Sequence, residues 1–233
     1  EFKNVTYIYE NTGIKALDNV SFKINKGETL AILGKTGSGK STIALLVARS
    51  LEPTSGEILI DGKNIHDINV ESIREEIGYV PQEAFLFSDS LTNNILFGSD
   101  DTDEQTAEIF AKKAVVHDNI MNFNQQYETV LGERGITLSG GQKQRVSIAR
   151  ALIKNAPILL LDDCLSAVDT ETEETILNNL LDYCKDKTTI IVSHRVSSAK
   201  NADWIIILDE GKILEQGTHS QLLEIGRASC RER

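Results

Sequence analysis

In the first third of the chain, segments with alternating hydrophobic and polar positions or with β-branched residues have the character of strands. This pattern covers residues 2–9 and 20–24, and residues 29–33 (TLAIL) form a short continuous apolar run. Residues 41–50 have helical character directly after a glycine-rich turn, and residues 55–62 form a strand-like segment bounded by glycines. The pattern therefore predicts a strand-rich start with one helix.

The middle of the chain, roughly residues 92–153, has the spacing of helices. Apolar residues recur at intervals of three and four within residues 104–116 and 145–153. We therefore expect a helical subdomain here.

The last third returns to strands. Its expected elements are strands at residues 157–161, 188–193, 202–208 and 211–217, and a helix at residues 171–184. Fully apolar strands that alternate with helices are typical of a mostly parallel sheet covered on both faces. The pattern predicts an α/β fold: a mostly parallel core sheet flanked by helices, an N-terminal antiparallel β subdomain and a helical subdomain.

Composition narrows the class of protein. The 233 residues are 40% hydrophobic and 25% charged, which is typical of a globular domain rather than a disordered or membrane-embedded chain. A formal net charge of −11 disfavours a nucleic-acid partner, because the surface would repel phosphate backbones. Three cysteines without paired spacing indicate neither a disulfide framework nor a zinc site, and they fit a reducing cytosol.

The two ends of the chain are interpreted separately. No initiating methionine precedes Glu1, so we interpret the chain as part of a longer polypeptide. Residues 224–233 (EIGRASCRER) break the pattern of the preceding helix and resemble the translation of a common sequencing adapter. We therefore interpret them as a non-native tail and assign residues 1–223 to one domain.

A glycine-rich segment follows the apolar run at residues 29–33 and precedes the first helix. The nine residues are Gly34, Lys35, Thr36, Gly37, Ser38, Gly39, Lys40, Ser41 and Thr42. They fit the pattern G-x-x-x-x-G-K-[ST], in which backbone N–H groups surround phosphate oxygens and the helix N-terminus adds positive potential. The pattern predicts that Lys40 reaches the β- and γ-phosphates of a nucleotide and that the Ser41 hydroxyl binds Mg²⁺.

Two adjacent carboxylates, Asp162 and Asp163, end the apolar run ILLL at residues 158–161. Two like charges beside a buried strand repel each other and are costly to desolvate unless something relieves them. A bound Mg²⁺ ion would do so, and we expect Asp162 to be its ligand.

The segment LSGGQKQR at residues 138–145 resembles the signature of the ATP-binding cassette (ABC) family. Other motifs of the family occur along the chain in the family's order. Tyr9 matches the aromatic residue that stacks on adenine, and Gln82 matches the glutamine that joins Mg²⁺ to the coupling surface. Residues 166–169 match the loop at the dimer interface, and His194 matches the switch histidine that contacts the γ-phosphate.

The resemblance implies the P-loop NTPase fold, with ATP and Mg²⁺ as cofactors. The implied Mg²⁺ ligands are Ser41, Gln82 and Asp162, and the implied catalytic residues are Asp163, His194 and Gln82. In this family two cassettes join head to tail, and the signature of one closes on the ATP held by the other. The implied signature contacts here come from Ser139, Gly140, Gly141 and Gln142.

Two further segments resemble the exporter branch of the family. These are Glu133-Arg134-Gly135 and residues 88–98 (SDSLTNNILFG), which meet the coupling helices of a membrane domain in such exporters. The resemblance implies a membrane domain upstream in the same polypeptide and a place at the cytoplasmic face of the plasma membrane. A stand-alone ATPase subunit of an importer remains the alternative.

Two other classes of cassette protein fit less well. Chromosome-maintenance and DNA-repair ATPases carry a coiled coil or zinc insertion between the two motifs, whereas Lys40 and Ser139 are only about 100 residues apart. A translation-factor protein would carry two cassettes and a basic linker, which the acidic chain does not support.

Asp163 departs from the family's usual glutamate, which polarises the attacking water. A carboxylate withdrawn by about 1 Å can lower the rate on the order of 10²-fold, because general-base catalysis requires hydrogen-bond reach. We therefore expect ATP to be held in a slow site and the intact signature to serve a different partner, a second half-transporter with glutamate. A homodimer with a compensating backbone or water position remains the rival.

Overall fold

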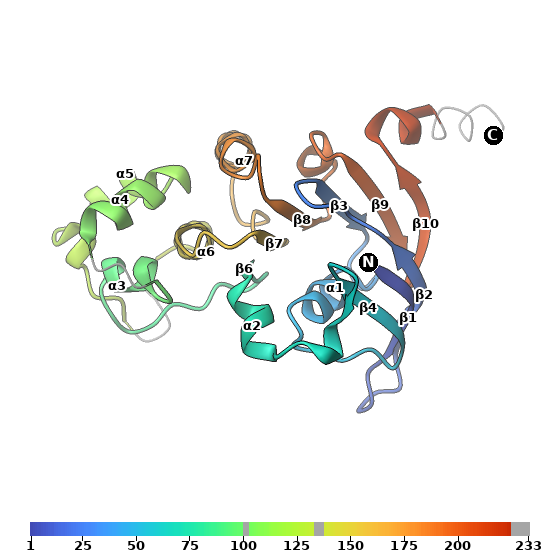
Figure 1. Ribbon diagram of the computed structural model, residues 1–233. Helices are drawn as coiled ribbons and strands as arrows, with labels where there is room; N and C mark the ends of the chain where they lie inside the picture. Colours follow the sequence, from blue (N-terminus) through green and yellow to red (C-terminus); the bar gives the residue numbers. More distant parts are fainter. Residues whose placement is uncertain (100–102, 133–137, 225–233) are drawn as a thin grey trace. The chain divides into compact units, whose positions relative to one another are not determined.

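The computed structural model describes residues 1–99, 103–132 and 138–224. The chain divides into two compact units, one formed by Glu1–Ile77 with Lys187–Arg233 and the other by Gly78–Asp186. Figure 1 labels the helices and strands and colours the chain from the N-terminus to the C-terminus. Two segments that were interpreted from the sequence lie outside the described residues: the exporter-like Glu133-Arg134-Gly135 and the suspected non-native tail from residue 225 onward.

A four-stranded antiparallel sheet opens the first unit, in the order β2-β1-β4-β5. Its strands are β1 (Phe2–Ile8), β2 (Lys15–Phe22), β4 (Ser55–Ile60) and β5 (Lys63–Asn64). Phe2, Val5, Leu17, Val20 and Phe22 of β1 and β2 are buried, and the rings of Phe2 and Phe22 stack with centroids 4.5 Å apart. The predicted N-terminal antiparallel subdomain is therefore confirmed.

The second strand begins five residues before the predicted segment and ends two residues before its end. Asp18 and Asn19 look like turn residues in the sequence, yet Asn19 lies within the strand at φ +56°. The register shifts by one residue between the pairs Val5–Val20 and Tyr7–Leu17, which is the signature of a β-bulge. Asparagine tolerates the left-handed conformation that the bulge needs, so the strand continues through it.

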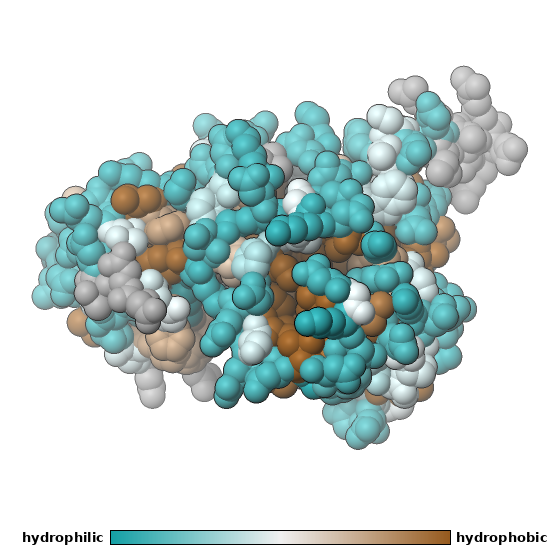
Figure 2. Space-filling view, viewed as in Figure 1, coloured by the Kyte–Doolittle hydropathy of each residue, from teal (hydrophilic) through white to brown (hydrophobic). Residues whose placement is uncertain are grey.

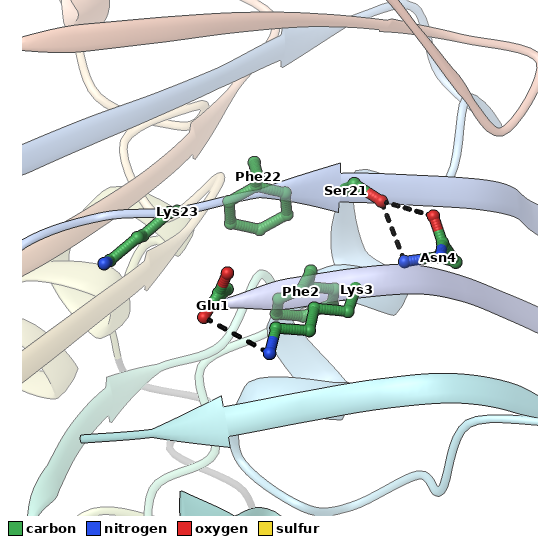
Figure 3. A pocket seen from close by; sticks show the side chains of 7 residues that line it. All are labelled: Glu1, Phe2, Lys3, Asn4, Ser21, Phe22 and Lys23. Atoms are coloured by element: carbon green, nitrogen blue, oxygen red, sulfur yellow. Dashed lines mark hydrogen bonds and ion pairs between the residues drawn. The ribbon is translucent and has the colours of Figure 1, made fainter. Parts of the chain in front are cut away.

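A shallow depression of about 340 Å³ lies over one end of this sheet (Figure 3). Its lining residues are Glu1, Phe2, Lys3, Asn4, Ser21, Phe22 and Lys23. Figure 3 shows Ser21 and Asn4 joined across β1 and β2, where the Ser21 hydroxyl donates to Asn4 Oδ1 at 3.1 Å. The lining includes none of the residues that the sequence predicts for the site.

The second sheet of the first unit carries the glycine-rich segment. It runs in the order β10-β9-β3-β8. The strands are β3 (Thr29–Gly34), β8 (Thr188–Ser193), β9 (Trp204–Asp209) and β10 (Lys212–Gly217). β3 is parallel to both β8 and β9, whereas β10 is antiparallel to β9. Helix α1 (Lys40–Val47) follows β3 and contacts both β3 and β8.

The second unit is mainly helical, as the spacing predicts. Its helices are α3 (Leu91–Leu96), α4 (Glu104–Lys113), α5 (His117–Met121), α6 (Gly140–Ile153) and α7 (Thr170–Tyr183). Strand β7 (Ile158–Asp162) neighbours β6 (Ile77–Val80), which begins at the last residue of the first unit. Together the sheets and helices confirm the α/β fold class.

Helix α2 (Val70–Glu75) and the strands β5 and β6 were not predicted from the sequence. Helix α2 is six residues long and buries only Ile73, so it shows too little of a helical period to detect. Asn69 caps this helix by accepting a hydrogen bond from the Glu71 amide at 2.7 Å. A capping side chain thus marks the helix more clearly than its apolar spacing does.

Figure 2 shows hydrophilic residues over most of the face in view. Across residues 1–99, 103–132 and 138–224, every helix is too short or too polar to cross a bilayer.

Candidate functional site

The glycine-rich segment forms a tight loop between β3 and α1, and two of its glycines are required by close backbone contacts. A Cβ atom on Gly34 would lie 2.3 Å from the Leu208 carbonyl oxygen and 2.6 Å from Ser38 Oγ. Gly39 has φ +101°, and a Cβ atom there would lie 2.3 Å from the Ala16 carbonyl oxygen. The loop therefore needs glycine at both positions before any ligand is considered.

Polar groups inside this loop fit a phosphate. Lys40 is buried, and its Nζ donates to the carbonyl oxygens of Gly34 and Lys35, at 2.8 Å each. The Ser38 hydroxyl is buried and has no hydrogen-bond partner among the described residues. Gly39 precedes α1 without a side-chain cap, and the first N–H groups of a helix have no partner within it. A buried cation, a spare hydroxyl and a helix N-terminus are suited to bind an anion.

Tyr9 and His194 both lie near this loop. The hydroxyls of Tyr9 and Thr42 are 3.2 Å apart, so the tyrosine ring sits beside the first turn of α1. Leu33 pairs with Ser193 across the parallel strands β3 and β8. Gly34 and His194 therefore leave the sheet at the same edge. Within the first unit, the structure brings the predicted aromatic, loop and histidine together.

The turn between β9 and β10 is hydrogen-bonded to the glycine-rich loop, and the sequence did not reveal this contact. The Gly211 amide donates to the Ser38 carbonyl at 3.1 Å, and the Asp18 amide donates to the Gly211 carbonyl at 2.9 Å. In the sequence, Glu210-Gly211 indicates only a hairpin turn. Its role depends on a contact between segments about 170 residues apart, which no local pattern encodes.

The second unit holds the acidic pair. Asp162 ends β7 and is 3% exposed, and its Oδ2 accepts a hydrogen bond from the Tyr79 hydroxyl at 3.5 Å. Burial, together with the Asp162 charge, raises the pKa of Tyr79, so the phenol stays protonated and can donate. Asp163 is partly buried and has φ +46°, in the left-handed region.

The signature segment forms the start of α6 through a reciprocal cap. Ser139 Oγ accepts a hydrogen bond from the Gln142 amide at 3.2 Å, and the Gln142 side chain accepts one from the Ser139 amide at 2.9 Å. A Cβ atom on Gly141 would lie 2.7 Å from the Ala167 carbonyl oxygen, whereas Gly140 has more space. The signature helix thus packs closely on the loop at residues 166–169.

Gln144 connects that loop to Gln82, and the sequence did not single it out. Gln144 is 6% exposed, and its Nε2 donates to the Gln82 carbonyl at 3.2 Å. Its Oε1 accepts a hydrogen bond from the Ala167 amide at 3.3 Å. Gln82 itself is exposed. Gln144 lies within the segment LSGGQKQR, but the sequence pattern does not show that its side chain is buried.

The predicted site residues therefore form two groups. Tyr9, residues 34–42 and His194 belong to the first unit; Gln82, residues 139–142, Asp162 and Asp163 belong to the second. Each group is organised within its own unit by the contacts given above.

Comparisons with known proteins agree with these motifs. The family described as "ABC transporter" matches residues 17–166. An uncharacterised ABC transporter ATP-binding protein, YknU, of Bacillus subtilis is 48% identical over 97% of this chain and 38% of its own length. The ATP-dependent lipid A-core flippase of Haemophilus influenzae is 45% identical over 96% of this chain and 38% of its own.

A solved structure, described as a bacterial Atm1-family ABC exporter with ATP bound, has the same fold. It superimposes with a TM-score of 0.91 at 43% identity, over 96% of this chain and 39% of that chain. This chain spans about two fifths of the length of these three relatives. With the family match covering more than half of its residues, the chain belongs to the ABC transporter family.

Proposed function

We propose that this chain is the ATP-binding and ATP-hydrolysing cassette that powers export of a substrate across a membrane. The observation that carries the proposal is the loop at residues 34–42, where a buried lysine, an unpartnered buried hydroxyl and a helix N-terminus fit a phosphate. ATP and Mg²⁺ are the proposed cofactors, and the bound Mg²⁺ would neutralise phosphate charge as the terminal phosphoryl group is transferred to water.

Each group of residues has a proposed task. In the first unit, Lys40 would release the loop carbonyls to hold the β- and γ-phosphates. Ser41 would bind Mg²⁺, Tyr9 would stack on adenine and His194 would contact the γ-phosphate. In the second unit, Asp162 and Gln82 would supply oxygen ligands to Mg²⁺. Tyr79 supports this assignment, since its hydroxyl holds one oxygen of the Asp162 carboxylate.

Asp163 would orient the attacking water, and its short side chain would make the reaction slow. Ser139, Gly140, Gly141 and Gln142 would then act on ATP held by a second cassette. A different half-transporter carrying glutamate is the proposed partner, and a homodimer is the rival arrangement. The sequence of the partner cassette decides between them.

Contact with a membrane domain is proposed for the segment that follows Gln82. Phe85 and Phe97 are 54% and 56% exposed, and Phe87 lies between them with ring centroids 5.1 and 4.4 Å away. Arg150 lies over the rings of Phe87 and Phe97 and donates to the Phe85 carbonyl at 2.8 Å. A rigid exposed aromatic cluster suits an anchor for a coupling helix, because such rings lose little conformational entropy on binding.

Export is favoured over an importer subunit by the relatives, whose names include a lipid A-core flippase and an Atm1-family exporter. The transported substrate is selected by the membrane domain. The proposed location is accordingly the cytoplasmic face of the plasma membrane, beneath such a domain.

ATP binding by the purified chain tests the proposal. We expect Lys40→Ala to weaken binding of a fluorescent ATP analogue at least about tenfold, since a buried charge–phosphate contact is lost. Lys26→Ala is the matched control, because Lys26 is exposed and precedes β3 at the end opposite the loop. Equal affinities of the wild type and Lys40→Ala would contradict the assignment of the loop.

A further inference from the structure

The Gln144 side chain is buried in the second unit and uses both ends of its amide. The Nε2 group donates to the Gln82 carbonyl at 3.2 Å, and Oε1 accepts from the Ala167 amide at 3.3 Å. Both partners are backbone groups outside α6: Gln82 precedes the helix and Ala167 follows it. A buried amide satisfied on both sides fixes its partners, because breaking either contact leaves a buried polar group unpaired.

We propose that Gln144 is a positioning residue that holds two functional segments, at Gln82 and at Ala167, in fixed relation to the signature helix. The inference rests on the proposed function, since it concerns how that site is held. Gln144 touches neither nucleotide nor metal in this proposal. It acts through the backbone of Gln82, a proposed Mg²⁺ ligand, and through the loop at residues 166–169, proposed to meet the second cassette.

The chemistry of the position favours glutamine over its nearest substitutes. One contact needs a donor and the other an acceptor, and a glutamine amide offers both at the end of one side chain. Glutamate would keep an acceptor for the Ala167 amide but would place an oxygen against the Gln82 carbonyl. Leucine has similar size but makes neither bond.

A second contact shows that the same loop is held tightly. A Cβ atom on Gly141 would lie 2.7 Å from the Ala167 carbonyl oxygen, so the helix backbone approaches Ala167 closely. Ala167 is thus held through its carbonyl side by packing on Gly141 and through its amide by Gln144. A shift of α6 would therefore be transmitted to both segments.

The experiment compares Gln144→Leu and Gln144→Glu with the wild-type chain. Mg²⁺ affinity is measured by titration at saturating ATP, and ATP affinity is measured separately in EDTA. Hydrogen exchange of the segments containing Gln82 and Ala167 is followed by mass spectrometry. Asn179→Leu is the matched control, since it removes one side-chain bond of 3.0 Å, to the Lys113 carbonyl, elsewhere in the same unit.

We expect Gln144→Leu to lower Mg²⁺ affinity about 10- to 100-fold, as removal of a group supporting a metal ligand does, while ATP affinity in EDTA stays unchanged. Exchange should rise at both segments. Gln144→Glu should raise exchange around Gln82 and retain protection at Ala167. Asn179→Leu should lower the unfolding midpoint without changing Mg²⁺ affinity.

Faster exchange without a change in Mg²⁺ affinity would overturn the proposal, because Gln144 would then be structural only. Unchanged exchange in Gln144→Leu would overturn it as well. A wild-type chain that binds no ATP would instead refute the proposed function, which the separate ATP titration in EDTA reveals on its own. Should Gln144→Leu fail to fold, Gln144→Glu still separates the two contacts.

Discussion

Asp163 leaves strand β7 in the left-handed region, at φ +46°. Aspartate and asparagine occupy this region more readily than other residues with side chains, because a short polar side chain can hydrogen-bond locally. Aspartate therefore suits the backbone conformation at position 163, although its short side chain makes it a weaker general base in the proposed reaction. Replacing Asp163 by glutamate would extend the reach of the carboxylate but would put a residue with less preference for the left-handed region at this position.

We expect Asp163→Glu to raise the single-turnover rate of ATP hydrolysis by on the order of 10²-fold, equivalent to about 2.7 kcal/mol of barrier. The longer side chain recovers about 1 Å of reach toward the water. The same variant should unfold slightly more easily in urea because of its backbone conformation. Equal rates for the two proteins, measured with protein in excess of ATP, would show that the shorter side chain is no handicap.

Two glycines of the proposed phosphate-binding loop should respond differently to alanine. Gly39 combines φ +101° with a Cβ position 2.3 Å from the Ala16 carbonyl oxygen, whereas Gly37 has φ +81° with open space around it. Gly39→Ala should cost several kcal/mol of stability and abolish ATP binding, and Gly37→Ala should cost about 1–2 kcal/mol. Urea unfolding and nucleotide titration of both variants measure the difference.

At this scale the sequence predicted where the loop at residues 34–42 needs glycine, at Gly34 and Gly39, because G-x-x-x-x-G-K-[ST] specifies a local conformation through glycine and a charge. It could not predict Gln144 or Gly211. Their contacts join segments that meet only in the folded chain, and a glutamine or a turn glycine carries no local sign of such a partner. Nor did the acidic pair reveal that Asp163 adopts a left-handed conformation.

Helix α6 shows how one short motif defines an element. Its reciprocal cap satisfies two backbone N–H groups at the helix start, and the close approach of Gly141 fixes the helix against the following loop. The cap resides in the same residues that are proposed to contact ATP on a second cassette. Stability and recognition therefore depend on the same serine.

Ser139→Ala should lower the free energy of unfolding by about 1 kcal/mol, the usual cost of losing an N-cap. Asp103→Ala provides the comparison, since Asp103 caps α4 by accepting a hydrogen bond from the Gln105 amide at 3.0 Å. Both variants should shift the urea midpoint similarly. Only Ser139→Ala should also weaken nucleotide-dependent association, and similar association by the two variants would contradict the signature assignment.

A cluster of charged side chains joins β2 to β10 and should make the free energy of unfolding depend on pH. Hydrogen bonds from Lys212 and then Lys15, both at 3.3 Å, lower the pKa of Asp18. A lowered native pKa gives stability that is complete above the ordinary aspartate value of about 3.9 and is lost as pH falls through the native value. Asp18→Asn should therefore unfold at a lower temperature at pH 7, and the difference should shrink as pH falls below about 3.9 and vanish once Asp18 is protonated in the folded chain. A difference independent of pH would contradict this origin.

Elements with a clear period were predicted closely: the helix expected at residues 171–184 is Thr170–Tyr183, and the strand expected at residues 188–193 is Thr188–Ser193. The failures have a common cause. Strand β2 contains a bulge occupied by Asn19, and α2 is too short to show a repeat. Local conformational exceptions and short elements escape periodicity, whereas tertiary packing accommodates both.

The whole molecule is proposed to work in pairs. Each cassette would contribute a phosphate-binding loop to one nucleotide and a signature helix to the other, so nucleotide would stabilise the pair. Chains with a formal net charge of −11 should repel one another without it, which favours dissociation after hydrolysis.

Light scattering measures this association. A non-hydrolysable ATP analogue with Mg²⁺ should double the mass of the particle, either with this chain alone or with a glutamate-bearing partner cassette. Lys40→Ala should prevent the change. Association of the chain with itself would favour the homodimer, and association only in the mixture would favour the heterodimer. No increase in mass in either case would refute nucleotide-dependent pairing.

The position of β3 has a consequence for synthesis on the ribosome. Its two hydrogen-bonded neighbours, β8 and β9, are both encoded in the last quarter of the chain. A nascent polypeptide therefore carries an apolar strand with two unpaired edges while some 150 further residues are translated. Truncated products that end before β8 should consequently aggregate or require chaperones, however well the helical segment folds.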